Sequence, residues 1–398
     1  MGDDVEIKQH SQTCPSSMRL NHSQNNIVFT QPMLPITANN PSPVLPHELI
    51  EKILSRVPVR SLVQFKCVCK SWKALISSPY FTKSHLISSN PYPQLFSNII
   101  TDRGIRIISY PTEPLLKNQS TPVTPVITIM MNQYRILGSY NGLLCLYDIN
   151  QCNVILWNPS IKFKSQRSPT IESFDDKMSL KCYGFGYDLV NDKYKLLVVM
   201  QNRRKVGETV TKMYTFGENS LKTICNFPCV PMWRLGKCVS GTLNWVVIKN
   251  PVNLERSILS FDFENENYRQ VLLPQCDGDE CIYTNVLEVL KNCLCVCFES
   301  RDQSVVWLMK EYGVTESWTK LMIVPHPMRN WNLTNMKPSF VDPLFISENG
   351  IAMVKTMCCK LVLHNVRKCG PQPFYLWVPS NYEPEIHIYH ESLVSVQW

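Results

Sequence analysis

Three cysteines alternate along one apolar run, and metal binding is the first chemistry they could support. Cys293, Cys295 and Cys297 would share one face of a strand, because side chains two apart point the same way. Zinc sites usually combine two closely spaced ligand pairs, such as Cys-x-x-Cys with a matching second pair. The sequence contains no such combination, so the pattern indicates buried structural thiols.

Two histidines beside a carboxylate are the second candidate, for a catalytic metal. His387 and His390 lie next to Glu391, but residues three apart in a strand point to opposite faces. The two imidazoles should therefore diverge, as structural or solvated histidines do. No nucleophile elbow or phosphate-binding loop occurs in the sequence either. We therefore expect no catalytic residue, no metal site and no cofactor.

The composition is that of a folded, intracellular protein. The chain has 398 residues, 44% hydrophobic and 18% charged, which allows two or three domains and excludes global disorder. No apolar run approaches the roughly 18–20 residues of a membrane span, and the polar N-terminus does not resemble a signal peptide. Its 17 cysteines are an odd number, and many lie in apolar runs. We expect a reducing compartment, the cytoplasm or nucleus, and no membrane association.

Positive charge is concentrated in one short segment. Residues 43–87 contain seven basic and two acidic residues, and so carry +5 of the net charge of +8. This charge is too mild and too poor in arginine to predict a nucleic-acid surface without a recognised motif. We expect no nucleic-acid partner.

The same segment is the one convincing helical part of the chain. Residues 1–42 are polar and predict a disordered extension, whereas residues 43–87 predict three short helices. The first would begin near Pro46 and end at Pro58, the second would be capped by Ser61, and Ser78-Pro79 would close the block. It has more bulky apolar residues than so small a unit can bury. It is therefore either a cap on the next domain or a surface that docks on a partner.

Residues 88–398 repeat a pair of strand patterns. Trp157, Tyr214, Phe261, Trp307 and Leu363 anchor one pattern at steps of 46 to 57 residues, and an apolar strand after a turn precedes each. Two hairpins about every 50 residues are typical of a β-propeller. We predict about six blades, the sixth formed by pairing strands near 94–110 with residues 387–397. A β-sandwich is the alternative fold.

The helical block resembles an F-box. The matching motifs are Leu45-Pro46-x-Glu48-Leu49, Ile53-Leu54, Pro58, Cys67-Val68, Lys70-Ser71-Trp72, Pro79-x-Phe81 and His85-Leu86. The remainder resembles the F-box-associated domain of the plant F-box/kelch-like family, in segments 138–148, 157–160, 183–199, 240–246, 258–274, 307–321 and 391–397. The fold class expected is therefore mainly β with a small N-terminal α domain, a three-helix F-box followed by a β-propeller-like domain.

The resemblance implies a non-enzymatic substrate receptor of an SCF-type ubiquitin ligase. In that family the F-box docks on a Skp-type adaptor, which a cullin scaffold carries, and the C-terminal domain recruits the protein substrate. Carried over by position, the adaptor contacts are Leu45, Pro46, Leu49, Ile53, Leu54, Leu62, Val68 and Trp72. The substrate and its binding residues are not readable from the sequence.

Two other functions compete with this interpretation. A propeller oxidase with a copper site would need Tyr, His and Cys ligands on converging loops, which the sequence does not show. A propeller scaffold acting outside the ligase is harder to separate by sequence, and association with a cullin would distinguish the two.

Overall fold

The structure is a computed structural model and describes most of the chain. The described residues are 45–88, 92–101, 104–117, 127–129, 133–171, 178–205, 208–250, 255–275, 283–300, 303–325, 341–356, 360–366, 374–377 and 385–396. Residues 47–398 form one unit and residues 1–46 another. The extension predicted for residues 1–42 lies outside the described residues.

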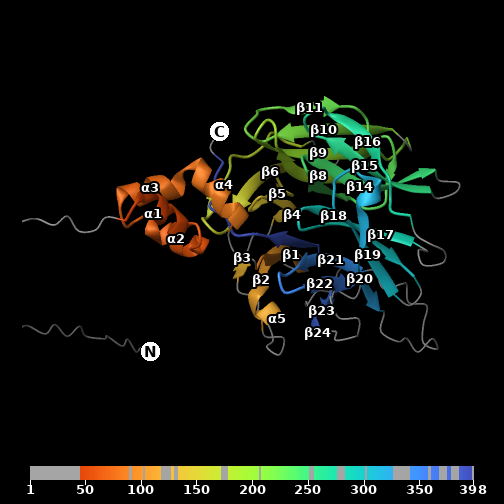
Figure 1. Cartoon of the computed structure of the whole chain (residues 1–398). Coiled ribbons are helices and arrows are strands. Elements are labelled where there is room, and N and C mark those ends of the chain that lie inside the picture. Colours follow the sequence, from red (N-terminus) through yellow and green to blue (C-terminus); the bar gives the residue numbers. More distant parts are fainter. Residues whose placement is uncertain are drawn as a thin grey trace, which may run out of the picture. The chain divides into compact units, whose positions relative to one another are not determined.

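The helical block contains four helices, where the sequence predicted three. They are α1 (His47–Leu54), α2 (Val59–Phe65), α3 (Lys70–Ser77) and α4 (Pro79–Ser88), grouped together at the side of the strands (Figure 1). The apolar stripe assigned to one second helix is split between α2 and α3. Among the described residues no helix is long and apolar enough to cross a membrane.

Local backbone chemistry explains the corrected helix boundaries. Pro58, not Ser61, occupies the N-cap of α2, and Cys69 is extended, with φ −156° and ψ 164°, so one helix cannot run through it. Pro79 begins α4 instead of closing the block, because proline at a first helical position loses no hydrogen bond. The Ser78 hydroxyl accepts a hydrogen bond from the backbone N–H of Phe81 at 3.2 Å and caps this helix.

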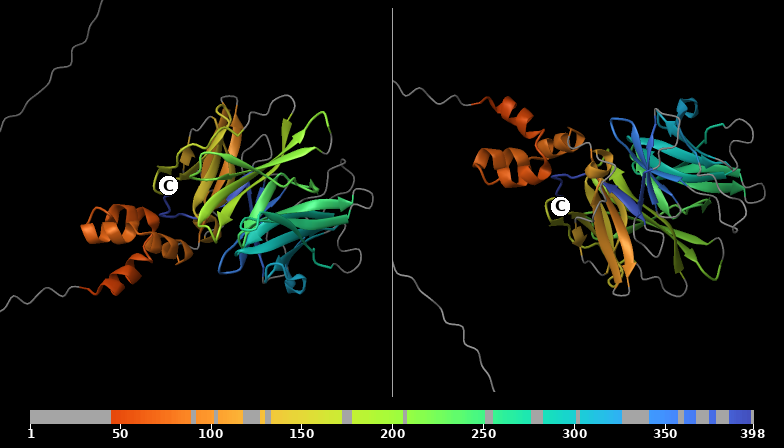
Figure 2. Two further views of the ribbon diagram at one scale, coloured as in Figure 1. Left: turned by 90° about the horizontal axis from the view of Figure 1, so that it is seen from above. Right: turned by 90° about the horizontal axis from the view of Figure 1, so that it is seen from below.

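Antiparallel strands form most of the rest of the described chain. Four sheets have four strands each, and a fifth has nine, in which a two-residue parallel contact between β8 and β13 joins two blades. Counting that sheet as two gives six blades in the described part of the chain, and Figure 2 shows them from two further sides.

The strands follow one another around the blades in chain order. The first blade contains β1 (Gln94–Thr101), β2 (Gly104–Pro111), β3 (Ile127–Ile129) and β25 (Ile386–Tyr389). The second contains β4 (Tyr134–Tyr140), β5 (Leu143–Asp148), β6 (Asn153–Asn158) and β7 (Phe163–Lys164). The third contains β8 (Met178–Asp188), β9 (Lys193–Asn202), β10 (Thr209–Thr215) and β11 (Leu221–Ile224). The fourth blade contains β12 (Val230–Pro231), β13 (Leu235–Val239), β14 (Thr242–Asn250), β15 (Glu255–Asp262) and β16 (Asn267–Val271). The fifth contains β17 (Tyr283–Leu290), β18 (Cys293–Glu299), β19 (Gln303–Met309) and β20 (Trp318–Pro325). The sixth contains β21 (Val341–Ile346), β22 (Ile351–Thr356), β23 (Lys360–Asn365) and β24 (Phe374–Trp377). Short helices α5 (Glu113–Lys117) and η2 (Thr315–Ser317) lie between strands.

The strand repeat predicted from the sequence is confirmed. The five anchors Trp157, Tyr214, Phe261, Trp307 and Leu363 lie on β6, β10, β15, β19 and β23, which occupy the same position in their blades. The predicted closure is present in part: β25 pairs with β1 from Gln94–Tyr389 to Ser97–Ile386, whereas residues 390–396 form no strand. Strands from both ends of the domain thus complete one blade.

An aspartate stabilises the same kind of turn in three blades. Asp148, Asp188 and Asp262 each end a strand, and one carboxylate oxygen of each accepts two backbone N–H bonds of 2.9–3.1 Å from the residues two and three positions later. Such Asx turns satisfy backbone donors that the strand leaves unpaired. They reverse the chain between neighbouring strands.

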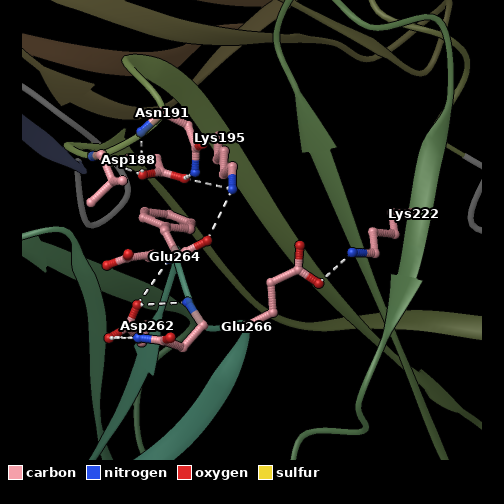
Figure 3. Close-up of polar contacts among 10 residues, drawn as sticks. Asp188, Asn191, Lys195, Lys222, Asp262, Glu264 and Glu266 are labelled. Atoms are coloured by element: carbon pink, nitrogen blue, oxygen red, sulfur yellow. Dashed lines mark hydrogen bonds and ion pairs between the residues drawn. The ribbon is translucent and has the colours of Figure 1, made fainter.

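One of these aspartates also joins two blades through a buried ion pair. Lys195 Nζ lies 2.8 Å from Asp188 Oδ2, and it donates a 2.9 Å hydrogen bond to the carbonyl of Phe263 in the next blade (Figure 3). Burial favours a higher pKa for Asp188, but hydrogen bonds from Lys195 and Asn191 outweigh it and lower the pKa. The carboxylate is therefore held ionised beside a buried ammonium group.

Candidate functional site

Helix α1 presents apolar side chains on two sides. Ile50 and Leu54 face the core of the helical block, where Leu54 is buried. Leu49 and Ile53 are four residues apart, lie on another side of the helix and are 45% and 53% exposed. Exposed large apolar side chains in such an array indicate a surface that binds a partner.

Other predicted contact residues are also accessible. Leu45 and Pro46 directly precede α1 in the sequence and are exposed. Val68, between α2 and α3, is 62% exposed. Trp72 of α3 is half-buried, with its ring 5.6 Å from that of Phe65 between centroids.

Two of the eight predicted contact residues are located in the core instead. Leu54 and Leu62 are 1% and 0% exposed and pack with Val59, Ile76 and Phe81. Side chains this deeply buried cannot reach a partner in this conformation. In this structure they hold the helices together and so position Leu49, Ile53, Val68 and Trp72, and their own role as adaptor contacts stays a prediction.

The C-terminal segment completes the core of the helical block. Leu393 is 3% exposed and belongs to the same hydrophobic cluster as Leu54 and Leu62. Ile161 of the propeller packs against this cluster. The helices and the propeller therefore share one hydrophobic core. An exposed ion pair between Lys83 and Asp192, at 2.6 Å, adds a contact that is worth little by itself.

A buried histidine supports the same packing. His85 of α4 is fully buried, and its Nε2 lies 2.8 Å from the carbonyl oxygen of Val57. Burial lowers the pKa of His85, and the bond to Val57 only partly opposes that shift. A neutral imidazole thus ties α4 to the turn that follows α1.

Asn158 holds the C-terminal segment in place. Its Nδ2 donates to the carbonyl and hydroxyl oxygens of Ser392, at 3.0 and 2.9 Å, and to the carbonyl of Val394 at 2.9 Å. Its Oδ1 accepts from the Tyr389 hydroxyl at 2.7 Å and from the Ser160 backbone at 3.0 Å. The sequence marked Asn158 as part of a repeated segment but gave no signal for this role.

Gly142 is required where this segment crosses the turn between β4 and β5. Its φ is +70°, and a Cβ there would lie 2.1 Å from the Ser392 hydroxyl oxygen. The Ser392 hydroxyl donates a 3.1 Å hydrogen bond to the Gly142 carbonyl. Only glycine permits this turn and the close approach of the C-terminal segment together.

Leu393→Ala is expected to loosen the helical block while the blades stay folded. Removing a buried leucine side chain costs about 2–5 kcal/mol, and this one fills a core that helices and propeller share. Amide hydrogen exchange should therefore become faster in α1–α4, with β14 and β18 as internal references. Ser395→Ala, at an exposed position of the same segment, is the control. Unchanged exchange in the helices would show that Leu393 does not stabilise them.

The residues considered for metal chemistry do not assemble into a site. Among the described residues no group of three or more His, Cys, Asp or Glu side chains is placed to hold a metal ion. Burial raises the pKa values of Cys295 and Cys297, whereas zinc binds thiolates. His387 of β25 is buried, whereas His390 follows that strand and is exposed, and the predicted divergence of the two imidazoles stays a prediction.

Comparison with known proteins identifies both parts of the chain. Residues 43–84 match the family model of the F-box domain, and residues 105–396 match that of the F-box associated beta propeller domain. The F-box/kelch-repeat protein At3g23880 of Arabidopsis thaliana is 31% identical over 339 residues, covering 81% of this chain and 87% of the relative. F-box protein At3g07870 of the same plant is 24% identical over 342 residues, covering 79% and 80%.

Proposed function

Because the chain belongs to the F-box protein family with an F-box associated beta propeller domain, we propose that it is a substrate-recognition subunit of an SCF-type ubiquitin ligase. Proteins of this family are typically non-catalytic ligase subunits. In this proposal the F-box docks on a Skp-type adaptor, the adaptor links the chain to a cullin, and the propeller recruits the protein to be modified.

The exposed pair on α1 is the observation that carries the docking proposal. Leu49 and Ile53 are apolar and accessible, although the helix already has a separate buried side. Together with Val68 and Trp72 they would supply the apolar centre that a stable interface needs. Apolar and aromatic side chains of this kind dominate binding energy when a partner covers them.

The shared core gives the proposed receptor a mechanism. Catalysis would belong to other subunits, and this chain would raise the effective concentration of substrate lysines near the conjugating enzyme. If the propeller were tethered loosely to the F-box, the lysines of a bound substrate would sample a large volume. Leu393 and Asn158 support a fixed connection between the F-box and the propeller. Such a connection would confine the volume that the substrate lysines sample.

The identity of the substrate is left open in this proposal. The loops between strands are where a propeller would bind it, as binding residues concentrate on loops held by a rigid scaffold. Arg203, Arg204 and Lys205, in the turn between β9 and β10, are exposed and available to such a partner. The assembled ligase would act in the cytoplasm or nucleus.

Association with a cullin tests the ligase role against a scaffold that acts alone. We expect the purified chain, a Skp-type adaptor and the N-terminal part of a cullin to elute as one complex in gel filtration. Omitting the adaptor should separate the chain from the cullin. An adaptor-bound chain that excludes the cullin would instead favour the scaffold outside the ligase.

A further inference from the structure

The positive charge of the F-box is unevenly distributed over its helices. All of residues 45–88 are described, and they include seven basic and two acidic residues. The two acidic residues lie on α1, where they offset one basic residue of that helix and one that follows it. The five residues that remain are all basic: Arg60, Lys66, Lys70, Lys73 and Lys83.

Two of these five cations are matched by carboxylates outside the F-box. Lys83 lies 2.6 Å from Asp192, in the turn between β8 and β9. Burial raises the pKa of Glu391, and a hydrogen bond from Gln94 and the charge of Arg60 oppose that shift. Arg60 is therefore near enough to Glu391 to interact with its carboxylate.

The other three cations, Lys66, Lys70 and Lys73, form no ion pair within the part of the chain that the structure describes. We call them the lysine cluster. Lys70 and Lys73 are exposed, and Lys66 is half-buried. Burial and then the charge of Lys73 lower the pKa of Lys66, so these two ammonium groups repel each other. An anion placed beside them would relieve that repulsion.

The local stability of α3 does not explain the lysine cluster. Lys66 follows the last residue of α2, where the helix dipole favours a cation. Lys70, however, is the first residue of α3, Lys73 lies within the same turn, and this turn contains no acidic residue. Cations at the start of a helix oppose its dipole. The two lysines therefore destabilise α3 in the free chain, and carboxylates of a partner would offset that effect.

The lysine cluster adjoins the proposed docking residues. Val68, which is 62% exposed, lies between Lys66 and Lys70 in the sequence, and the half-buried Trp72 directly precedes Lys73. A partner that covers Val68 and Trp72 must therefore bring its own surface close to the three lysines. Covering unpaired charges with an apolar or basic surface would cost free energy, so the chemistry of this edge selects an acidic surface.

We propose that a Skp-type adaptor meets the lysine cluster with an acidic segment at the edge of the apolar interface. This inference rests on the proposed function, and it adds to that function the charge of the partner's surface. Exposed lysines attract carboxylates over several ångströms without fixing their geometry, so the cluster raises the rate at which the adaptor associates. Three lysines without an arginine are too few for a nucleic-acid surface, which leaves a protein as the occupant.

Stopped-flow measurement of association between the full chain and a purified adaptor tests this proposal. We expect the association rate constant to fall at least about tenfold between about 20 mM and 500 mM salt, because salt screens exposed charges. Replacing the three lysines with glutamine should lower the rate at low salt by about tenfold and remove most of its salt dependence, with a smaller change in dissociation. The matched control makes the same change in net charge at three exposed lysines of the propeller and should keep the unmodified rate: Lys205, Lys291 and Lys310.

The possible results separate this inference from the docking proposal. Adaptor binding with the same association rate in the glutamine variant and the unmodified chain would overturn the role of the lysine cluster and leave the docking proposal intact. Absence of adaptor binding to every form of the chain would overturn both. Vesicles of phosphatidylcholine with about 30% phosphatidylserine test an anionic membrane as the occupant. Vesicle binding that the glutamine variant loses, with adaptor association unchanged, would also overturn the proposal.

A stability measurement shows that the glutamine variant is folded. Its midpoint of urea unfolding should not fall below that of the unmodified chain, because the substitutions remove repulsion between Lys66 and Lys73 and two cations from the start of α3. A slower association rate in this variant then reports the loss of attraction between the lysine cluster and the adaptor.

Discussion

Leu49→Asp combined with Ile53→Asp is expected to abolish binding of a Skp-type adaptor while the chain stays folded. Both side chains are about half exposed in the free protein, so each replacement should change the free energy of unfolding by no more than about 0.5 kcal/mol, and the pair by no more than about 1 kcal/mol. In the complex they would be covered. Burying an apolar side chain contributes about 1.5–3 kcal/mol, and an aspartate in its place must lose its water.

The expected loss of affinity is at least about 100-fold, measured by calorimetry with the purified adaptor. The matched control is Leu189→Asp with Val190→Asp, which places the same charges on two exposed apolar residues of the turn between β8 and β9. This control should bind as the unmodified chain does. Retained affinity in the α1 variant, with an unchanged circular dichroism spectrum, would remove α1 from the docking surface.

Lys195→Met is expected to give the largest loss of stability, about 3–5 kcal/mol in the free energy of unfolding. The substitution leaves the Asp188 carboxylate buried without its 2.8 Å partner, and it removes the bond to the Phe263 carbonyl that joins two blades. A buried charge without a partner is far more costly than the pair. Urea denaturation followed by tryptophan fluorescence measures the effect.

Two further variants separate the effect of breaking the buried ion pair from the effect of replacing any lysine with methionine. Lys222→Met removes the ammonium that pairs with Glu266 nearby (Figure 3), but 61% of the Lys222 side chain is exposed, so about 0–1 kcal/mol is expected. Adding Asp188→Asn to Lys195→Met should restore part of the lost stability, because the uncompensated charge is gone. Equal losses of unfolding free energy in Lys195→Met and Lys222→Met would contradict the view that the buried Asp188–Lys195 pair stabilises the contact between the two blades.

The repeat of strands could be predicted because its signals are local. Period-two apolar runs and turn residues mark each hairpin, so the anchors from Trp157 to Leu363 all fall at the same blade position. The closing blade followed from the count of units. The division of the helical block into four helices could not be predicted, because Cys69 and Ser78 interrupt the helical backbone through their extended conformation, which an apolar stripe does not reveal.

The candidate site was predicted only in part, for a related reason. The apolar residues of α1 include Leu49, Ile50, Ile53 and Leu54, and the pattern does not show which pair faces the core. The residues that fix the F-box were not found, because Asn158 and Ser392 are 234 positions apart. Contacts at such separation leave no periodic signal in a single sequence.

Binding of the unmodified chain to a Skp-type adaptor tests the central proposal most directly. Titration calorimetry at low salt should give one adaptor per chain with a Kd of about 1 μM or tighter, as expected for an interface of standard size with an apolar centre. Absence of binding by a chain that unfolds cooperatively would contradict the ligase role. The helical block would then be a cap on the propeller and no docking module.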